Sequence, residues 1–282
     1  MSYSLNQLYQ AAGLSKQAVH QQLIRQEAFE GRVKDLIVEV DVLRDAHPGC
    51  GLERMHNTLQ PGFIGRDRFI ELFTELGYKL KKKKNYHRTT YSSKEYYSNL
   101  IKGLVIDKPN FLWQSDITYY RVKDRFYYVV FIIDVYTKII VGHRVSDHMR
   151  AKANLECFNM GVNRYGAPDI HHSDRGSQYN ATEYVNRLNQ FNTQISMGEK
   201  AQDNAYAERI NKTIKEEFID HWKPQTGEEL KKMVRKAVNY YNKSRQHKHL
   251  KKMTPLYFLD HWKTLPVDQR PKMTIFNDES LT

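Results

Sequence analysis

The chain has 282 residues, enough for a catalytic domain with smaller modules attached to it. Its formal net charge of +12 and pI of about 9.4 favour a polyanionic partner, which we expect to be nucleic acid. No run of about 18 apolar residues and no signal-peptide pattern occurs, and Cys50 and Cys157 lack metal-ligand or disulfide spacing. These features argue against a membrane protein or a disulfide-rich secreted protein, and they predict a cytoplasmic one.

Residues 1–46 are predicted to be helical. A turn at Gly13 precedes a helix that Ser15 can cap and that runs through Ile24, and a second periodic helix is expected from Glu30 to Ala46. This spacing suits a helix-turn-helix, which presents a helix to a DNA groove. An ordinary helical hairpin would show the same pattern.

Residues 47–78 are predicted to form a second helical module. Two short periodic segments flank Pro61 and Gly62, and Gly77 ends the second of them. We interpret this module as another helix-turn-helix-like unit.

Residues 79–108 are interpreted as a basic linker. Between Lys79 and Lys94 there are seven basic residues and no acidic ones. Such a run either tracks DNA phosphates or acts as a passive tether, and we favour phosphate contacts. The residues expected to make them are Lys81, Lys82, Lys83, Lys84 and Arg88.

From residue 109 to residue 222 the apolar pattern becomes that of an α/β domain. Three strands joined by short turns are expected between residues 112 and 146, as an antiparallel meander. Helices and strands then alternate over residues 151–165, 170–173, 182–191, 194–197 and 204–220. The pattern predicts a mixed sheet flanked by helices, and it fits a ribonuclease-H-like fold better than a Rossmann fold, which needs a Gly-rich first turn. Residues 223–282 are expected to form a helical extension with a frayed last dozen residues.

Three acidic residues stand in specific local contexts. Asp116 lies within the first strand, Asp174 ends a short strand before Gly176, and Glu208 lies on an amphipathic helix. If the fold brings them together, they supply hard oxygen ligands for two divalent ions about 4 Å apart, which can activate water or a hydroxyl for attack on a phosphodiester. The competing interpretations are a hydrogen bond within the sheet for Asp116, a turn cap for Asp174 and a solvated helix face for Glu208.

The helix of Glu208 presents further polar groups on the same side. Helical spacing places Asn204, Asn211, Lys212 and Lys215 close to Glu208 in angle. We therefore expect Lys212 and Lys215 to approach DNA, and Asn204 to orient a metal-bound water or a base.

Other ionisable residues near the three acids are assigned structural roles. Asp124 and Asp134 fit turns at strand ends. His171 and His172 do not predict a zinc site, because no Cys or His partner occurs at ligand spacing.

The contexts of the three acids resemble the motifs of one enzyme family. The segments are Trp113–Tyr120, His171–Tyr179 and Asp203–Asn211. They look like those of second-frame (OrfB-type) transposases of the large two-frame bacterial insertion-sequence family, which are relatives of retroviral integrases. The likeness covers about residues 45–260. The 33 residues between Asp174 and Glu208 are slightly fewer than is usual in that family, which a shortened loop near residues 197–202 would absorb.

The resemblance implies a DDE transposase in which Asp116, Asp174 and Glu208 are catalytic and bind two Mg²⁺ or Mn²⁺ ions. The implied reaction is cleavage of double-stranded DNA at the terminal inverted repeats of the element and transfer of the 3′-hydroxyl into target DNA. A homo-oligomer is expected in the synaptic complex, and an upstream-frame protein could be a further partner. Beyond the linker, the residues expected at DNA are Arg175, Asn204, Arg209, Lys212, Lys215 and Arg245.

Two alternatives belong to other functional classes. One is a DNA-binding regulator of transposition without catalysis, against which the intact triad argues. The other is a ribonuclease-H-like nuclease that hydrolyses without joining, against which the helical N-terminal modules argue, since recognition of element ends is needed only for transposition.

Overall fold

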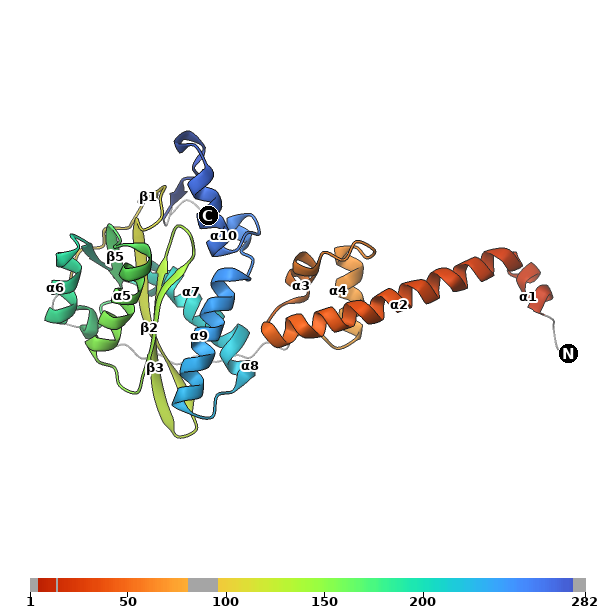
Figure 1. Cartoon of the computed structure of the whole chain (residues 1–282), viewed down its shortest axis with the longest axis horizontal. Helices are drawn as coiled ribbons and strands as arrows, with labels where there is room; N and C mark the ends of the chain where they lie inside the picture. Colours follow the sequence, from red (N-terminus) through yellow and green to blue (C-terminus); the bar gives the residue numbers. More distant parts are fainter. Residues whose placement is uncertain (1–4, 14, 81–95, 276–282) are drawn as a thin grey trace. The chain divides into compact units, whose positions relative to one another are not determined.

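A computed structural model of the protein describes residues 5–13, 15–80 and 96–275, and the chain divides into two compact units. The first unit consists of residues 1–46 and 50–80, and the second of residues 47–49 and 81–282. The first is helical and the second is built of helices and strands (Figure 1). Within the described ranges, no helix is long and apolar enough to cross a membrane. The expected DNA contacts Lys81, Lys82, Lys83, Lys84 and Arg88 lie outside the described residues.

The N-terminal unit contains the helices α1 (Leu5–Ala11), α2 (Lys16–Ala46), α3 (Leu52–Leu59) and α4 (Arg66–Glu75). Ser15 caps α2 as expected, because its Oγ accepts a 3.0 Å hydrogen bond from the backbone N–H of Ala18. The expected break between Ile24 and Glu30 is wrong, since α2 continues without interruption for 31 residues. The intervening residues 25–29 include neither glycine nor proline and are mostly good helix formers, so nothing ends the helix there.

Contacts within the N-terminal unit join segments that the sequence separates. The guanidinium of Arg44 on α2 donates to the backbone carbonyls of Cys50 (3.0 Å) and Tyr78 (2.9 Å). Apart from residues 47–49, the two predicted modules 1–46 and 47–78 therefore form a single unit rather than two.

The second unit is built on a five-stranded mixed sheet with the strand order β4-β3-β2-β5-β6. The strands are β2 (Leu112–Val122), β3 (Arg125–Asp134), β4 (Ile140–Ser146), β5 (Ile170–Ser173) and β6 (Gln194–Met197). β2, β3 and β4 form the expected antiparallel meander, whereas β5 pairs parallel with β2 and β6 pairs parallel with β5. The predicted α/β fold class with a mixed, ribonuclease-H-like sheet is confirmed.

Helices cover both faces of this sheet because the central strands are apolar on both sides. They are α5 (Ala151–Tyr165), α6 (Thr182–Gln190), α7 (Ala205–Ile214), a π-helical turn (Lys215–Ile219), α8 (Asp220–Trp222) and α9 (Gly227–Lys243). Phe131 on β3 packs with residues of α7 and α9, whereas its neighbour Ile132 packs with residues of α5 and α6. This alternation is the two-residue period of a strand with two buried faces.

The C-terminal segment completes the same unit. A helix, α10 (Pro255–Thr264), is followed by β7 (Met273–Thr274), which pairs antiparallel with β1 (Val105–Ile106). Ile101 and Ile275 are fully buried in a cluster with residues of α10. The end of the predicted linker and the predicted C-terminal extension therefore pack on the catalytic core. The expected fraying is wrong for residues 271–275, and residues 276–282 lie outside the described residues.

Candidate active site

Two of the three acidic residues lie at the same point of the sheet. The parallel pairing of β2 with β5 ends at Ser115 and Ser173, and the next residues are Asp116 and Asp174. Because neighbouring strands lie about 4.8 Å apart, the two aspartates start from adjacent backbone positions. β5 ends at Ser173, whereas β2 continues to Val122. Both aspartates therefore lie where the edge of β2 that pairs with β5 becomes unpaired.

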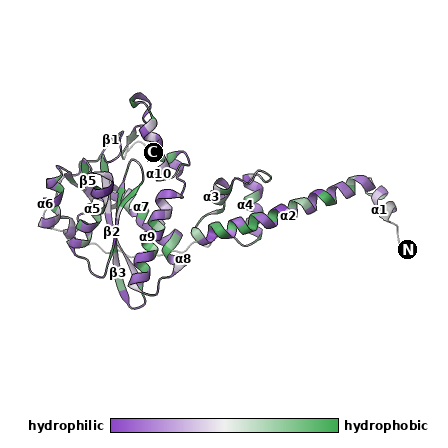
Figure 2. Cartoon of the chain, in the orientation of Figure 1, coloured by the Kyte–Doolittle hydropathy of each residue, from purple (hydrophilic) through white to green (hydrophobic). Residues whose placement is uncertain are grey.

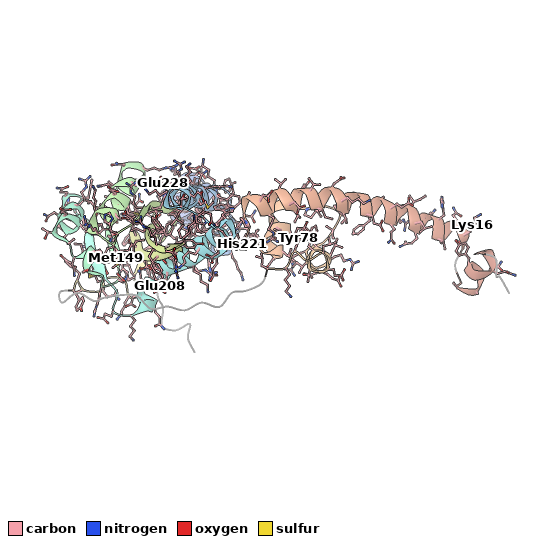
Figure 3. All side chains as sticks on the ribbon, turned by 90° about the horizontal axis from the view of Figure 1, so that it is seen from below. Lys16, Tyr78, Met149, Glu208, His221 and Glu228 are labelled. Atoms are coloured by element: carbon pink, nitrogen blue, oxygen red, sulfur yellow. The ribbon has the colours of Figure 1, made fainter. Side chains whose placement is uncertain are left out.

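Glu208 is brought to this place by α7, on which it is exposed (Figure 3). The start of α7 is held by Gln114, a buried side chain two residues before Asp116 on β2. Its Nε2 donates to the carbonyl of Asp203 (3.1 Å), and its Oε1 accepts from the backbone N–H of Tyr206 (3.1 Å). The side chain of Gln114 thus satisfies backbone groups before and after the first residue of α7, and it fixes the position of α7 along β2.

Asn204 also joins α7 to β2, which corrects its expected role at DNA. It is 2% exposed, and its Nδ2 donates to the carbonyl of Ser115 (2.9 Å). The helical-wheel argument does not apply to it, because it lies in a 3₁₀ turn, Ala201–Asn204, that precedes α7. Asn204 is therefore a buried link next to Asp116 rather than a surface contact.

The carboxylates of both aspartates are oriented by hydrogen bonds. Asp116 accepts from Asn211 Nδ2 on α7 (2.6 Å) and from the backbone N–H of Ile117 (2.9 Å). Asp174 accepts from the backbone N–H of Gly176 (3.0 Å). A Cβ at Gly176 would lie only 3.0 Å from Asp174 Oδ1, so the glycine permits the close approach that the sequence suggested.

The three acids influence one another electrostatically. Burial raises the pKa of Asp116 to about 8, and the charges of Asp174 and Glu208 contribute to the rise in the same direction. Burial raises the pKa of Asp174. The pKa of Glu208 is raised by burial and then by the charge of Asp174. The cluster therefore favours either a bound proton or a bound cation.

These side chains fit divalent metal in their chemistry. Carboxylate oxygens are the ligands that Mg²⁺ and Mn²⁺ prefer, and a cation would offset the repulsion that raises the pKa of Asp116. Among the described residues, no three His, Cys, Asp or Glu side chains are close enough to hold an ion as they stand. Glu208 is exposed, so its side chain is free to move toward the two aspartates.

Sequence reasoning gave no role to Gln114, and it noted Asn211 only for its place beside Glu208 on the helix. The available signal for Gln114 is its spacing, since it lies two positions from Asp116 in the same strand, which puts both side chains on one face. Asn211 was expected on the same side of the helix as Glu208, one helical turn away, but its hydrogen bond to Asp116 was not predicted.

The basic residues of the Glu208 helix differ in their surroundings. Arg209 and Lys212 are exposed, and Lys212 Nζ lies 3.9 Å from Glu216. Lys215 is partly buried and donates to Thr118 Oγ1 (3.4 Å) and to the carbonyl of Tyr119 (3.3 Å) on β2. Lys215 thus lies along the open edge of β2, beyond Asp116.

Arg175, next to Asp174, lies over an aromatic ring. Its guanidinium carbon is 4.2 Å from the ring centroid of Tyr96, and its Nη2 is 3.8 Å from Glu199. The side chain is one-third exposed, so it remains available at the edge of the site.

Arg245 does not lie on the surface where the sequence placed it. It is buried and donates from Nε and Nη2 to the two carboxylate oxygens of Glu217, at 2.8 and 2.7 Å. Glu217 also bonds His47 Nε2 at 2.7 Å. Arg245 is a structural partner of the π-helical turn that follows α7, so its expected role in DNA contact is wrong.

Asp134 has the role in a turn that the sequence predicted, and His171 and His172 make hydrogen bonds within the fold. Asp134 accepts bonds from the turn that follows β3. His171 Nε2 bonds the hydroxyl of Tyr184 (3.0 Å), and His172 Nδ1 bonds Ser196 Oγ (2.8 Å). Burial lowers the pKa of His171 to about 3 and that of His172 to about 4, so both imidazoles are neutral at pH 7.

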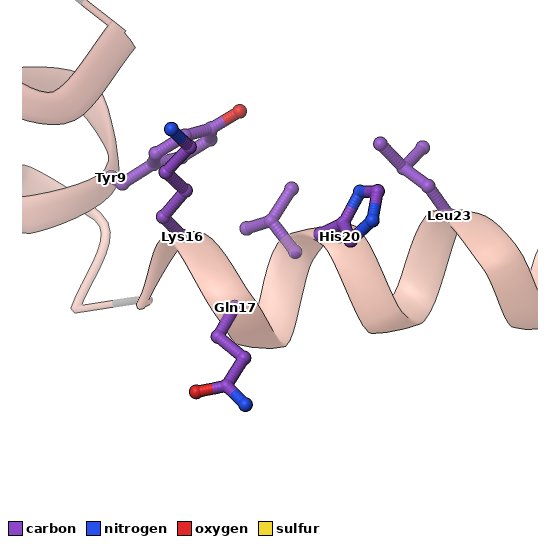
Figure 4. A pocket seen from close by; sticks show the side chains of 6 residues that line it. Tyr9, Lys16, Gln17, His20 and Leu23 are labelled. Carbon is purple, nitrogen blue, oxygen red and sulfur yellow. The ribbon is translucent and has the colours of Figure 1, made fainter.

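A hollow in the N-terminal unit lies between α1 and the start of α2 (Figure 4). Its volume is about 480 Å³, and its lining residues are Tyr9, Lys16, Gln17, Val19, His20 and Leu23. No carboxylate lines it, so it does not offer the oxygen ligands of the acidic cluster.

Comparison with known proteins agrees with this architecture. The integrase core domain family matches residues 106–202, and a second integrase core domain family matches residues 189–255. The chain is 31% identical over 207 residues to the insertion element IS600 uncharacterized 31 kDa protein of Shigella sonnei, a match that covers 71% of this chain and 76% of that protein. It is 36% identical over 165 residues to the transposase for insertion sequence element IS629 of Shigella sonnei, covering 56% of this chain and 55% of that transposase.

A solved structure shares the fold at low identity. The simian T-cell lymphotropic virus intasome in complex with PP2A regulatory subunit B56 gamma aligns with a TM-score of 0.50 and 16% identity, covering 79% of this chain and 74% of that chain. The fold and the matching domain define an integrase-core protein. The chain belongs to the bacterial insertion-sequence transposases that carry this core.

Proposed function

We propose that the chain cleaves DNA at the ends of an insertion sequence and transfers the freed 3′-hydroxyl into target DNA, with Asp116, Asp174 and Glu208 as the catalytic residues. The observation that supports this assignment is the mutual electrostatic influence of the three acids where β5 ends and β2 runs on. In an insertion-sequence transposase, a cluster of this chemistry favours phosphodiester transfer over a purely structural role.

The proposed reaction has two steps. Attack of water on a phosphodiester at the element end forms a P–O bond to the water oxygen as the P–O3′ bond breaks. The products are a 5′-phosphate that carries the water oxygen and a 3′-hydroxyl that carries a proton from the water. That hydroxyl then attacks a target phosphodiester, so that one P–O bond forms as another breaks. Two Mg²⁺ or Mn²⁺ ions, held by the three carboxylates, would activate the nucleophile and stabilise the leaving oxygen.

The residues around the carboxylates have positioning roles in this proposal. Asn211 orients Asp116 through its 2.6 Å hydrogen bond. Gln114 and Asn204 hold the start of α7, and therefore Glu208, against β2. Because the pKa of Asp116 is raised to about 8, binding of a cation near neutral pH should release a proton from the site.

DNA contacts remain part of the proposal. Arg209 and Lys212 are exposed on the Glu208 helix, Lys215 lies along β2, and Arg175 adjoins Asp174. Phosphate contacts by Lys81, Lys82, Lys83, Lys84 and Arg88 belong to the proposal because of the basic run in which they lie. Synapsis by a homo-oligomer and an upstream-frame partner belong to it through the family resemblance.

The proposed function is tested with a labelled duplex that carries an element end and a separate target duplex. The parent chain should cleave the end and join it to the target in Mg²⁺, and it should bind without turnover in Ca²⁺. Asp174→Asn should bind as the parent does but neither cleave nor join, whereas Asp124→Asn, the same change in an exposed turn, should retain both steps. Cleavage without joining would favour a nuclease, and binding without either step would favour a regulator.

A further inference from the structure

The segment between Leu230 and Leu259 has a charge pattern that the active site does not use. It contains nine Lys and Arg residues and no Asp or Glu. Part of it forms a short loop after α9, residues 248–252, which we call the basic loop. The exposed side chains of the basic loop are Lys248, His249, Lys251 and Lys252.

The backbone of the basic loop is held in one conformation. The N–H of His247 donates to the carbonyl of Met253 (3.0 Å), and the N–H of Met253 donates to the carbonyl of Leu250 (2.9 Å). Leu250 is 4% exposed and belongs to a buried cluster with Ile106 and Phe258. A loop that is anchored in this way loses little conformational entropy when its side chains bind a ligand.

Two successive lysines of the basic loop adopt a conformation that suits glycine. The φ angles of Lys251 and Lys252 are 53° and 65°. A Cβ is disfavoured in this left-handed region, which glycine enters freely. Glycine would therefore form the same loop at lower conformational cost, and what lysine adds is a solvated positive charge.

The exposed face of α9 continues the basic surface. Lys232, Lys236 and Lys243 are exposed and fall within about 40° of one another around the helix axis. The opposite face carries Val234 and Val238, which are buried against the sheet. Figure 2 shows α9 in both hydrophilic and hydrophobic colours, as expected for these two faces.

We propose that the basic loop and this face of α9 bind the phosphate backbone of duplex DNA. The inference rests on the proposed function, since it takes DNA as the partner. Lysine is a flexible point charge that contacts phosphate without reading bases, so the contact should be independent of sequence. The segment itself contains no acidic residue, and the carboxylate of Glu228 in the first turn of α9 is paired with Lys231, so the positive charges of the basic loop and of the later turns of α9 favour a polyanion.

The test compares two double variants of the full chain in binding to a duplex of arbitrary sequence, with Ca²⁺ in place of Mg²⁺. Lys248→Gln with Lys251→Gly removes two charges from the basic loop. The control variant, Lys152→Gln with Lys223→Gly, removes two positive charges at exposed positions elsewhere. Lys223 matches Lys251 because it is exposed and has a φ angle of 50°. The basic-loop variant should bind about tenfold more weakly near 0.1 M salt, and its slope of log K against log[salt] should be shallower by about 0.9 for each lost phosphate contact. The control should stay within about twofold of the parent.

Thermal unfolding separates binding from folding in this test. Lys251→Gly alone should leave Tm at or above that of the parent, because glycine relieves the left-handed conformation, yet it should still weaken binding. Equal binding by the basic-loop variant and the control would overturn the inference while leaving the proposed function intact, provided that the parent binds and cleaves. A parent that neither binds duplex DNA nor cleaves it would overturn both.

Discussion

Asn211 on α7 donates a 2.6 Å hydrogen bond to Asp116 on β2, and it lies one helical turn after Glu208. The helix that presents the glutamate therefore also orients the aspartate of the central strand. Because α7 is held to β2 by Gln114 as well, the relative position of these two acids depends on one helix–strand interface.

Asn211→Ala should weaken metal use more than it weakens folding. The hydrogen bond from Asn211 lowers the pKa of Asp116, so its loss should raise that pKa further and move metal-dependent cleavage to higher pH. We expect the Mg²⁺ concentration for half-maximal cleavage at pH 7 to rise at least about tenfold, since a hydrogen bond to a charged group contributes about 1.5 kcal/mol or more and about 1.4 kcal/mol corresponds to tenfold. Asn163→Ala, an exposed position on α5, is the matched control. An unchanged pH profile and Mg²⁺ requirement would show that Asn211 does not orient Asp116.

Asp116→Asn should stabilise the metal-free protein at alkaline pH. The pKa of Asp116 is 3.8 in the unfolded reference and about 8 in the fold, so the folded state binds more protons between these values. Stability should therefore fall as pH rises through this window in the parent, and this loss should disappear in the variant. We expect a higher Tm for the variant at pH 8 and equal values near pH 4; each 1 kcal/mol corresponds to about 2–4 °C.

The Tm of the parent and of Asp116→Asn should also respond differently to added Mg²⁺. Mg²⁺ should raise the Tm of the parent at pH 8, because an ion that binds only the folded state stabilises it, and should have little effect on Asp116→Asn. A Tm difference between the two proteins that is the same at pH 4 and pH 8 would contradict the raised pKa.

Gln114→Leu should disturb the placement of α7. The substitution puts an apolar side chain of similar size in place of the amide and leaves the carbonyl of Asp203 and the N–H of Tyr206 without the partners that Gln114 supplies. We expect a loss of about 2 kcal/mol in the free energy of unfolding. The decisive readout is strand transfer by the folded fraction at low temperature, which should fall at least about tenfold. Gln202→Leu, an exposed position in the same segment, serves as the control. Full activity of folded Gln114→Leu would show that α7 is held without this side chain.

Arg245→Ala should reduce stability rather than DNA affinity. Its removal leaves the Glu217 carboxylate, which is 17% exposed, without its bidentate partner. Loss of one member of such a pair costs about 3 kcal/mol, which chemical denaturation of the variant should detect. The salt dependence of DNA binding by the folded variant should match that of the parent, whereas a shallower slope would restore Arg245 as a phosphate contact.

The parts of the fold that follow local chemistry could be predicted from the sequence. The helix 151–165 agrees with its predicted bounds, because Gly166 and Pro168 end it. The burial of Asn204 could not be predicted from a helical wheel, since the α-helix begins only at Ala205. The partner of Arg245 lies 28 residues earlier in the chain, and only tertiary packing reveals it.

In the candidate site, too, the local features could be predicted from the sequence and the long-range contacts could not. The contexts of Asp116, Asp174 and Glu208 are local in sequence and could be read directly. The supporting bonds are long-range: Asn211 meets Asp116 across 95 residues, and Gln114 meets Asp203 across 89. Sequence patterns identify the acids, whereas the pairing of β2 with β5 and the docking of α7 determine how they can act together.

Strand transfer of a pre-cleaved element end in Mg²⁺ by Glu208→Gln tests the central claim most directly. The variant retains the size of the side chain and removes its charge from an exposed position, so folding and duplex binding should match the parent. If the three acids act as one metal-binding set, its rate should fall by at least about 10³-fold, as with removal of one member of a catalytic group, and chelation of Mg²⁺ should lower the parent to the same level. Strand transfer by Glu208→Gln at the parental rate would contradict the account, because the exposed glutamate would then take no part in the chemistry.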